Sequence, residues 1–220
     1  MSWNTVESTA VWQGGLVLAA YALGCLNTGY YLVRLKTGHD IRTLGSGNAG
    51  ARNVGRILGK PGLIATLAGD LLKGAVAILL AKNLHGNELT IALAMVAVVM
   101  GHLWPVQLGF RGGKGAATGC GAIIALDPMA GGILLGVCGL GVGVLRRSTL
   151  GTMIAFGLSP VVALLLKRSV YEVGAFAAVA LLVILSHRSN LKSGMAGSQG
   201  RAPAAPAPHS DVPPLPAGKR

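Results

Sequence analysis

The chain has 220 residues, 52% of them apolar and only 12% charged, and its formal net charge is +12. A soluble domain usually carries about 25% charged residues. This composition therefore excludes an ordinary soluble domain and indicates a helical protein that crosses a membrane several times. The positive charge could suggest a nucleic-acid ligand, but its placement beside apolar segments favours a membrane face. We expect membrane lipid, and no nucleic acid, among the partners.

Seven apolar segments recur along the chain, some near the ~20 residues that cross a bilayer and some shorter. They predict an all-α, polytopic membrane protein with about seven transmembrane helices. Glycines between positions 131 and 143 are expected to let these helices pack closely. The segments run from about residue 11 to 33, 62 to 81, 89 to 100, 116 to 126, 129 to 145, 150 to 166 and 173 to 185.

The end of the chain differs in composition from the rest. From about Ser193 it is rich in Pro, Ala, Gly and Ser, and such a composition cannot bury enough apolar surface to fold. We expect a single integral-membrane domain over residues 1–192 and a disordered cytoplasmic tail over 193–220.

The distribution of Lys and Arg predicts the orientation, because these residues accumulate in cytoplasmic loops. Seven spans put the two ends on opposite sides, and 15 of the 19 Lys and Arg residues share a face with the C-terminus. Only Lys82, Lys167 and Arg168 fall on the other face, and Lys73 lies within a span. We expect the N-terminus outside and the C-terminus in the cytoplasm. All glycine-rich or polar clusters then fall on the cytoplasmic face.

Two glycine-rich basic segments on that face are candidate phosphate sites. Residues 45–56 contain four glycines, two asparagines and two arginines, within a loop expected from about Arg34 to Lys60. Glycine lets successive backbone N–H groups turn toward one anion, and arginine adds a fixed charge. The alternative is a flexible basic connector held by anionic lipid. Residues 109–115 repeat the pattern, but they are no Walker P-loop because glycine follows Lys114. For this second segment the alternative is a snorkelling interfacial pair.

Four polar residues in or beside the spans have open roles. Asp70 and Lys73 are three positions apart and share one helical face; they either neutralise each other or contribute to the anion site. His187, with Asn190 three residues on, either caps a helix end or donates to a phosphate or carbonyl group. His102 either orients the second glycine-rich segment or anchors it.

Several catalytic patterns are missing from the sequence. No histidine is followed five positions later by aspartate, and there is no G-x-S-x-G motif. The three cysteines stand singly and no metal-ligand cluster occurs. We expect no metal and no cofactor. Cations, backbone amides and hydroxyls remain, and these stabilise phosphates and a developing oxyanion.

Five motifs, in order, resemble the membrane acyl-phosphate:glycerol-3-phosphate acyltransferases, the PlsY family, over about residues 24–190. That family has seven spans and an active site at the cytoplasmic surface of the bacterial inner membrane. The resemblance implies transfer of an acyl group from acyl-phosphate to the 1-hydroxyl of glycerol 3-phosphate, with phosphate on the substrate accepting the proton. The alternative is a membrane transporter or binder of phosphate esters. The motifs are residues 45–56, 70–74, 101–106, 110–118 and 187–190.

The resemblance also implies the site residues. The expected catalytic residues are Ser46, Arg56, Lys114, His187 and Asn190. Two positions depart from the usual family pattern: Arg52 replaces a threonine, and Thr149 takes the place of a serine. The expected substrate-binding residues are Gly45, Gly47, Asn48, Arg52, Asn53, Asp70, Lys73, His102, Arg111, Gly112, Gly113 and Thr149.

Overall fold

The computed structural model describes the backbone of residues 3–144 and 148–196, and side chains between 9 and 188 except at 142 and 145–148. Residues Met1–Arg188 form one compact unit. Of the second unit, Ser189–Arg220, only the helical residues 189–196 are described. Most of the tail expected from Ser193 lies outside the described residues.

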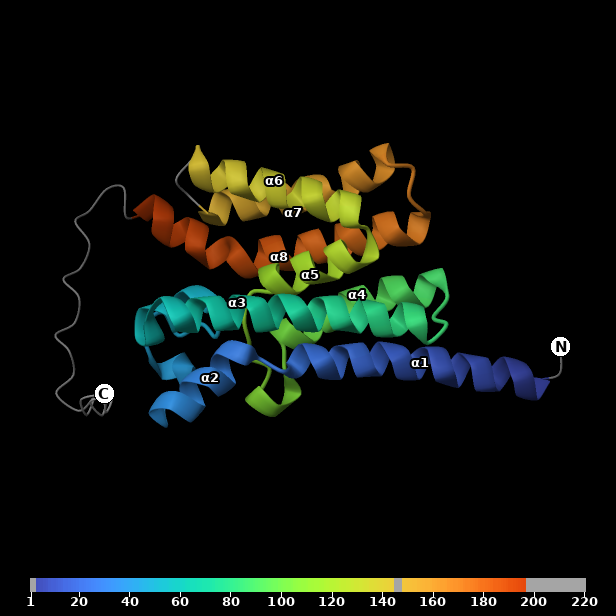
Figure 1. The fold of residues 1–220 in the computed structure, drawn as a ribbon, viewed down its shortest axis with the longest axis horizontal. Coiled ribbons are helices and arrows are strands. Elements are labelled where there is room, and N and C mark those ends of the chain that lie inside the picture. The colour runs from blue at the N-terminus through green and yellow to red at the C-terminus, as the bar shows by residue number, and fades with distance from the viewer. Residues whose placement is uncertain (1–2, 145–147, 197–220) are drawn as a thin grey trace. The chain divides into compact units, whose positions relative to one another are not determined.

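The described residues form α-helices joined by short connections, with two 3-10 helices, η1 and η2, in the polar segments (Figure 1). The predicted all-α class is confirmed for this part of the chain. The helices are α1 (Trp3–Cys25), α2 (Thr28–Thr37), η1 (Ile41–Thr43), α3 (Ala51–Asn83), α4 (Glu88–Leu103), η2 (Val106–Leu108), α5 (Ala116–Leu126), α6 (Pro128–Gly143), α7 (Ser148–Leu165) and α8 (Val170–Ala196).

Two groups of helices pack around one apolar core in the compact unit. Helix α1 runs beside α4, α3 contacts both of them and α5, and α6 pairs with α7 (Figure 1). The core continues through α5, where Gly119 lies against the Phe156 ring of α7 and Val179 of α8. Both of these side chains are fully buried. Burial of such side chains is the main stabilising contribution among helices of this kind.

The described residues of the seven predicted apolar segments are largely helical, with a break between α1 and α2 in the first, although not every helix is long enough by itself to cross a bilayer. Helix α5 is about 16 Å long, against the ~30 Å of a hydrocarbon core. Shorter apolar helices also cover Pro128–Gly141 and Thr149–Leu165. Within the described residues, four helical segments are long and apolar enough to span: Thr9–Thr37, Ala51–Asn83, Glu88–Leu108 and Val170–Arg188.

The loop expected from Arg34 to Lys60 is shorter than predicted: residues 38–50 lie outside α-helices, with only η1 among them, but both ends of the expected range are helical. Helix α2 continues to Thr37 and α3 already begins at Ala51. Inside α3, Gly59 has φ 72°, a conformation that glycine adopts at little cost. It stands two residues before Pro61, whose ring restricts the preceding backbone. The backbone at Gly59 is non-helical, so α3 consists of two helical segments that meet at a kink. The predicted start of the second span, at about residue 62, lies just after this kink.

Most of the glycines that were expected to pack helices together, those between positions 131 and 143, do not make close contacts. A Cβ on Gly132, Gly136 or Gly139 of α6 would meet no atom within 4 Å, so the predicted packing role is wrong there. The role is confirmed at Gly131 and Gly141, where a Cβ would lie 2.6 Å from Ile124 and 2.3 Å from Gly151. An equally close crossing joins α3 and α5. A Cβ on Gly121 would lie 1.9 Å from the Leu71 carbonyl oxygen, and one on Gly74 would lie 2.1 Å from the Thr118 carbonyl oxygen. These glycines bring the two backbones into contact.

Gly121→Ala is expected to destabilise the protein by roughly 1–3 kcal/mol, because the added methyl group meets backbone that cannot move aside. The measurement is the thermal unfolding midpoint in detergent. Gly132→Ala is the matched control: its Cβ meets open space, and alanine's helix propensity adds up to about 1 kcal/mol. Equal midpoints for the two variants would contradict close packing of α3 on α5.

Candidate active site

Three helices begin close together at one end of the compact unit. The Arg52 guanidinium, in the first turn of α3, donates to Thr149 Oγ1 in the first turn of α7 over 3.0 Å. Its charge also acts on Lys114, two residues before α5. The structure therefore brings together Arg52, Lys114 and Thr149, which the sequence placed in three separate segments.

The N-termini of α3 and α5, like that of α2, lack the side-chain caps found on α4 and α6. Gly50 precedes α3 and Gly115 precedes α5, and neither supplies a capping side chain. In contrast, Asn87 caps α4 and Asp127 caps α6. An uncapped helix start leaves N–H groups and about half a positive charge of the helix dipole for a ligand. Such termini favour anions.

Two basic side chains and an imidazole face this region. Lys114 is half-buried, and both its burial and the nearby charge of Arg52 lower the pKa of its ammonium group. The charges of Lys114 and Arg52 also act on the His187 ring at the end of α8. Like charges held this close repel one another, and an anion bound between them would offset that repulsion.

His187 presents one ring nitrogen to the region. Its Nδ1 lies 2.8 Å from the Val183 carbonyl oxygen, and because a carbonyl only accepts, Nδ1 carries the proton. Nε2 is then the ring atom that can contact a ligand. The adjacent Ser186 hydroxyl lies 2.8 Å from the Lys114 carbonyl oxygen, so α8 also fixes the backbone that carries Lys114.

Asn53 organises the first glycine-rich segment from within α3. Its side chain is buried; Oδ1 accepts from the Ser46 N–H over 2.9 Å, and Nδ2 donates to the carbonyls of Leu44 and Asn48 over 2.9 and 3.0 Å. Gly45 has φ 56°, and a Cβ there would lie 2.4 Å from Asn53 Oδ1. The amide is thus turned toward the loop, and its predicted contact with substrate stays a prediction.

The N–H groups predicted to cradle the anion are mostly engaged within the protein. Gly47 donates to Leu44 O, and Gly50 donates to Asn48 Oδ1. The expectation of an open nest is wrong for these amides, because a turn and the Asn48 side chain already accept from them. The same holds in the second segment, where Gly112 donates to Leu103 O and Gly113 to His102 O. The helix starts supply the unengaged donors instead.

The remaining predicted residues fall into two groups. Ser46, Arg56 and Arg111 are exposed, and neither arginine has an ion pair or hydrogen bond within the described residues. Asp70 and Lys73 do share one helical face, with Lys73 Nζ 3.0 Å from Asp70 Oδ1. The side chain of Asn190 lies outside the described residues. No group of three or more metal-ligating side chains occurs in the part of the chain searched, residues 3–144 and 148–196.

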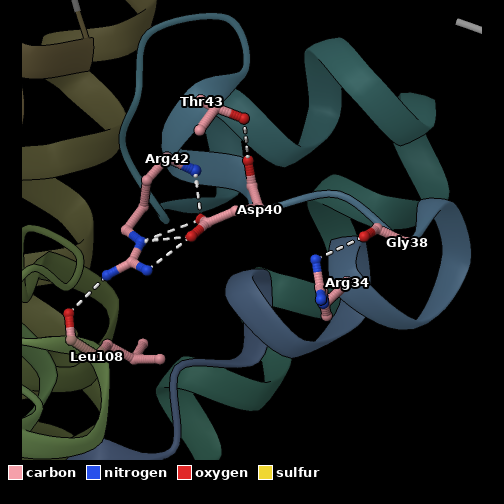
Figure 2. Close-up of polar contacts among 6 residues, drawn as sticks. All are labelled: Arg34, Gly38, Asp40, Arg42, Thr43 and Leu108. Atoms are coloured by element: carbon pink, nitrogen blue, oxygen red, sulfur yellow. Dashed lines mark hydrogen bonds and ion pairs between the residues drawn. The ribbon is translucent and has the colours of Figure 1, made fainter.

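Sequence reasoning missed Arg42, which joins the two glycine-rich segments (Figure 2). Its guanidinium forms a bidentate pair with Asp40, with contacts of 2.6 to 3.0 Å, and donates to the carbonyl of Leu108 in η2. It also lies 5.2 Å from the centre of the Tyr30 ring. The one sequence signal was Asp40, which caps η1 by accepting from the Arg42 N–H.

These features define an integral membrane protein of packed helices with a cationic site where three helices begin. A sequence model of the family described as glycerol-3-phosphate acyltransferase matches residues 15–197. The chain belongs to that family.

Named relatives agree with this assignment. The chain is 41% identical over 177 residues to glycerol-3-phosphate acyltransferase 1 of Desulfitobacterium hafniense strain Y51, covering 80% of this chain and 88% of the relative. It is 44% identical over 186 residues to the glycerol-3-phosphate acyltransferase of Geobacter metallireducens, covering 84% and 95%.

Solved structures are similar too. The crystal structure of PlsY, an integral membrane glycerol 3-phosphate acyltransferase, in its glycerol 3-phosphate form has a TM-score of 0.79 at 32% identity, covering 86% of this chain and 94% of that chain. The form of PlsY with lysophosphatidic acid has a TM-score of 0.76 at 30% identity.

Asn53→Asp is expected to loosen the first segment and lower the unfolding midpoint, by roughly 1–3 kcal/mol in stability. The new carboxylate keeps the bond from Ser46 but turns an acceptor toward two carbonyl oxygens. Asn48→Asp is the matched control, because Asn48 is used only as an acceptor, for the Gly50 N–H. Thermal unfolding with limited proteolysis of the 42–56 region measures both. Equal losses in the two variants would contradict the role assigned to Asn53.

Arg42→Lys is expected to free the second segment, because an ammonium cannot hold Asp40 in a fork and reach Leu108 as well. Hydrogen exchange of peptides covering 106–115 should then speed up. Arg34→Lys is the control, since Arg34 bonds only to Gly38 of its own segment (Figure 2). Unchanged exchange in Arg42→Lys would argue against the link.

The pH dependence of this pair has a definite sign. The hydrogen bond from Arg42 lowers the pKa of Asp40 below its ordinary value. The pair's contribution is therefore complete at neutral pH and is lost as pH falls through the lowered pKa.

Proposed function

We propose that this protein transfers a fatty acyl group from acyl-phosphate to the 1-hydroxyl of glycerol 3-phosphate, giving lysophosphatidate and inorganic phosphate for phospholipid synthesis. The observation that carries the proposal is the meeting of Arg52, Lys114 and His187 with uncapped helix starts in a chain of this family. Both substrates are phosphate esters or anhydrides, and both need such a site. The relatives' names and the glycerol 3-phosphate form of PlsY support the acceptor.

The reaction needs charge stabilisation more than a strong protein base. The acceptor hydroxyl oxygen bonds to the acyl carbon, the bond from that carbon to the phosphate oxygen breaks, and the hydroxyl proton passes to phosphate. Negative charge grows on the carbonyl oxygen and on the leaving phosphate. Fixed cations and helix N–H groups stabilise both, and one such donor contributes about 10²- to 10³-fold in rate.

We propose the individual roles that the resemblance to the family implies. Exposed Ser46 and Arg56, with the start of α3, bind one phosphate group; Lys114 and Arg111, with the start of α5, bind the other. Asn48 and the glycines 45 and 47 shape the first phosphate site. His187, through Nε2, and Asn190 hold the glycerol part and the reacting carbonyl. Arg52, tied to Thr149, adds positive charge between the two sites.

We also propose that the site faces the cytoplasm, with seven crossings of a bacterial inner membrane, the N-terminus outside and the C-terminus inside. Lys82 and Arg168 support this orientation. Lys82 Nζ lies 3.4 Å from the Ala125 carbonyl oxygen, and Arg168 pairs with Asp127 over 2.8 Å. These two cations thus meet at the α5–α6 junction, the C-terminal end of α5, whereas the candidate site lies at its start. That separation matches the excess of Lys and Arg expected on the cytoplasmic side.

Transport or simple binding of phosphate esters is not favoured. The named relatives are acyltransferases, and a transport path needs polar groups deep in the bundle. The buried Asp70 and Lys73 neutralise each other.

The purified protein in lipid is expected to form lysophosphatidate from palmitoyl-phosphate and glycerol 3-phosphate, and to form far less with acyl-CoA as donor. Arg56→Ala and Lys114→Ala should each lower kcat/KM by about 100-fold or more. The readout is labelled lysophosphatidate with initial rates in both substrates.

Lys60→Ala is the control for loss of positive charge, because Lys60 is exposed on the same helix and has no assigned role. It should keep wild-type rates. Absence of product from wild type, or equal rates for the Arg56, Lys114 and Lys60 variants, would refute the proposal.

A further inference from the structure

Three ionisable side chains are buried in the compact unit without any part in the chemistry above. Asp70 is 2% exposed, Lys73 7% and His102 3%. Charged groups this deep among apolar helices are costly unless they are paired, and their presence usually has a functional reason. The resemblance to the family implied that these three side chains contact substrate. The contacts that the structure gives them are with the protein itself.

Lys73 connects three elements of the fold. Its Nζ lies 3.0 Å from Asp70 Oδ1 on the same helix, an ion pair without hydrogen-bond geometry. It donates to the carbonyl of Leu26, at the break between α1 and α2, and to His102 Nδ1 near the end of α4, each over 2.8 Å. An ammonium group has only donors. Nδ1 of His102 is therefore an acceptor, and the ring proton is on Nε2.

His102 in turn holds the second glycine-rich segment. Its carbonyl oxygen accepts from the Gly113 N–H over 3.0 Å and from Asn27 Nδ2 over 3.1 Å. Its ring lies against Gly113 so closely that a Cβ there would be 2.1 Å from Nε2. The imidazole occupies the space that a side chain at 113 would need. The next residue in the chain is Lys114.

We propose that Asp70, Lys73 and His102 are positioning residues that set the place of Lys114 by fixing Gly113, and that they do not bind substrate. Asp70 orients the Lys73 ammonium, Lys73 fixes the imidazole, and the imidazole fixes the backbone one residue before the cation that holds a phosphate. A buried ion pair is weak evidence for stability alone. Displacing a catalytic group by 1 Å can cost about 100-fold in rate. The inference rests on the proposed function, because it needs Lys114 to bind substrate.

A steric cycle tests the contact between His102 and Gly113. Gly113→Ala should lower kcat/KM by roughly 10- to 100-fold, because its methyl group displaces the ring. His102→Asn keeps an acceptor for Lys73 and removes the rest of the ring. Combining the two should recover activity to the level of His102→Asn alone.

Gly112→Ala is the matched control for this cycle. Its Cβ would lie 2.1 Å from the His102 carbonyl oxygen, which is backbone. A smaller side chain at 102 leaves that clash in place, so His102→Asn should not rescue Gly112→Ala. Rescue of both glycine variants, or of neither, would overturn the proposal.

A second cycle tests whether the three residues act through Lys114. Asp70→Asn combined with Lys73→Met removes both charges and leaves none buried alone. This double variant should raise KM for the substrate whose phosphate Lys114 holds by roughly tenfold or more, with a smaller change in kcat. Adding Lys114→Ala should cost little beyond Lys114→Ala itself, because the position of a missing ammonium no longer matters.

The outcomes separate this proposal from the function it rests on. The positioning role would be overturned if the loss of activity in the double variant and the loss in Lys114→Ala multiply fully when the changes are combined. An unchanged KM in a folded double variant would overturn it as well. If the double variant does not fold, the steric cycle decides alone. A wild-type protein that makes no lysophosphatidate would instead refute the proposed function.

Discussion

Positive charge held together at one end of the helices is the constraint on which the rest of the structure depends. The starts of α3, α5 and α7 meet there through Arg52, whose charge acts on Lys114. Helix starts and cations at close range repel each other. The packing of the surrounding helices opposes that repulsion, and under the proposed function a phosphate group of the substrate would offset it.

The glycine-rich segments beside the site are rigid because side chains from the helices occupy the space around their backbones. Asn53 holds the first segment from inside α3. The His102 ring packs against Gly113 of the second segment. Arg42, just before the first segment, donates to Leu108, just before the second. These polar side chains lie against backbone atoms of the two segments. At the edge of an apolar medium, backbone N–H and C=O groups need such hydrogen-bond partners within the protein. The glycines of these segments therefore serve mainly to let neighbouring side chains pack against the backbone. Presenting backbone N–H groups to a ligand is secondary.

Much of the fold could be predicted from the sequence, because apolar segments of transmembrane length leave the chain few options besides helices. The segment 116–126 coincides with α5, the first predicted span is divided between α1 and α2, and the others differ from their helices mainly at the ends. The errors have a common cause. The first loop is shorter than expected, because α2 continues to Thr37 and α3 begins at Ala51, and tertiary contacts override local propensity. Among the glycines of α6, Gly141 packs against Gly151 as expected, whereas Gly136 meets open space, because helix contact depends on which face meets a neighbour.

The sequence by itself determined the class of protein, its family and the segments that carry the site, because these depend on composition, length and local motifs. Only the tertiary structure decided which atoms are available to a ligand. It engaged the amides of Gly47 and Gly113 in hydrogen bonds within the protein and left the starts of α3 and α5 without side-chain caps. It gave Arg42 and His102 their supporting roles through partners 66 and 11 positions away in the chain. The physical reason is that hydrogen-bond satisfaction and close packing depend on contacts between distant segments, and no local pattern records which partner a polar group will find.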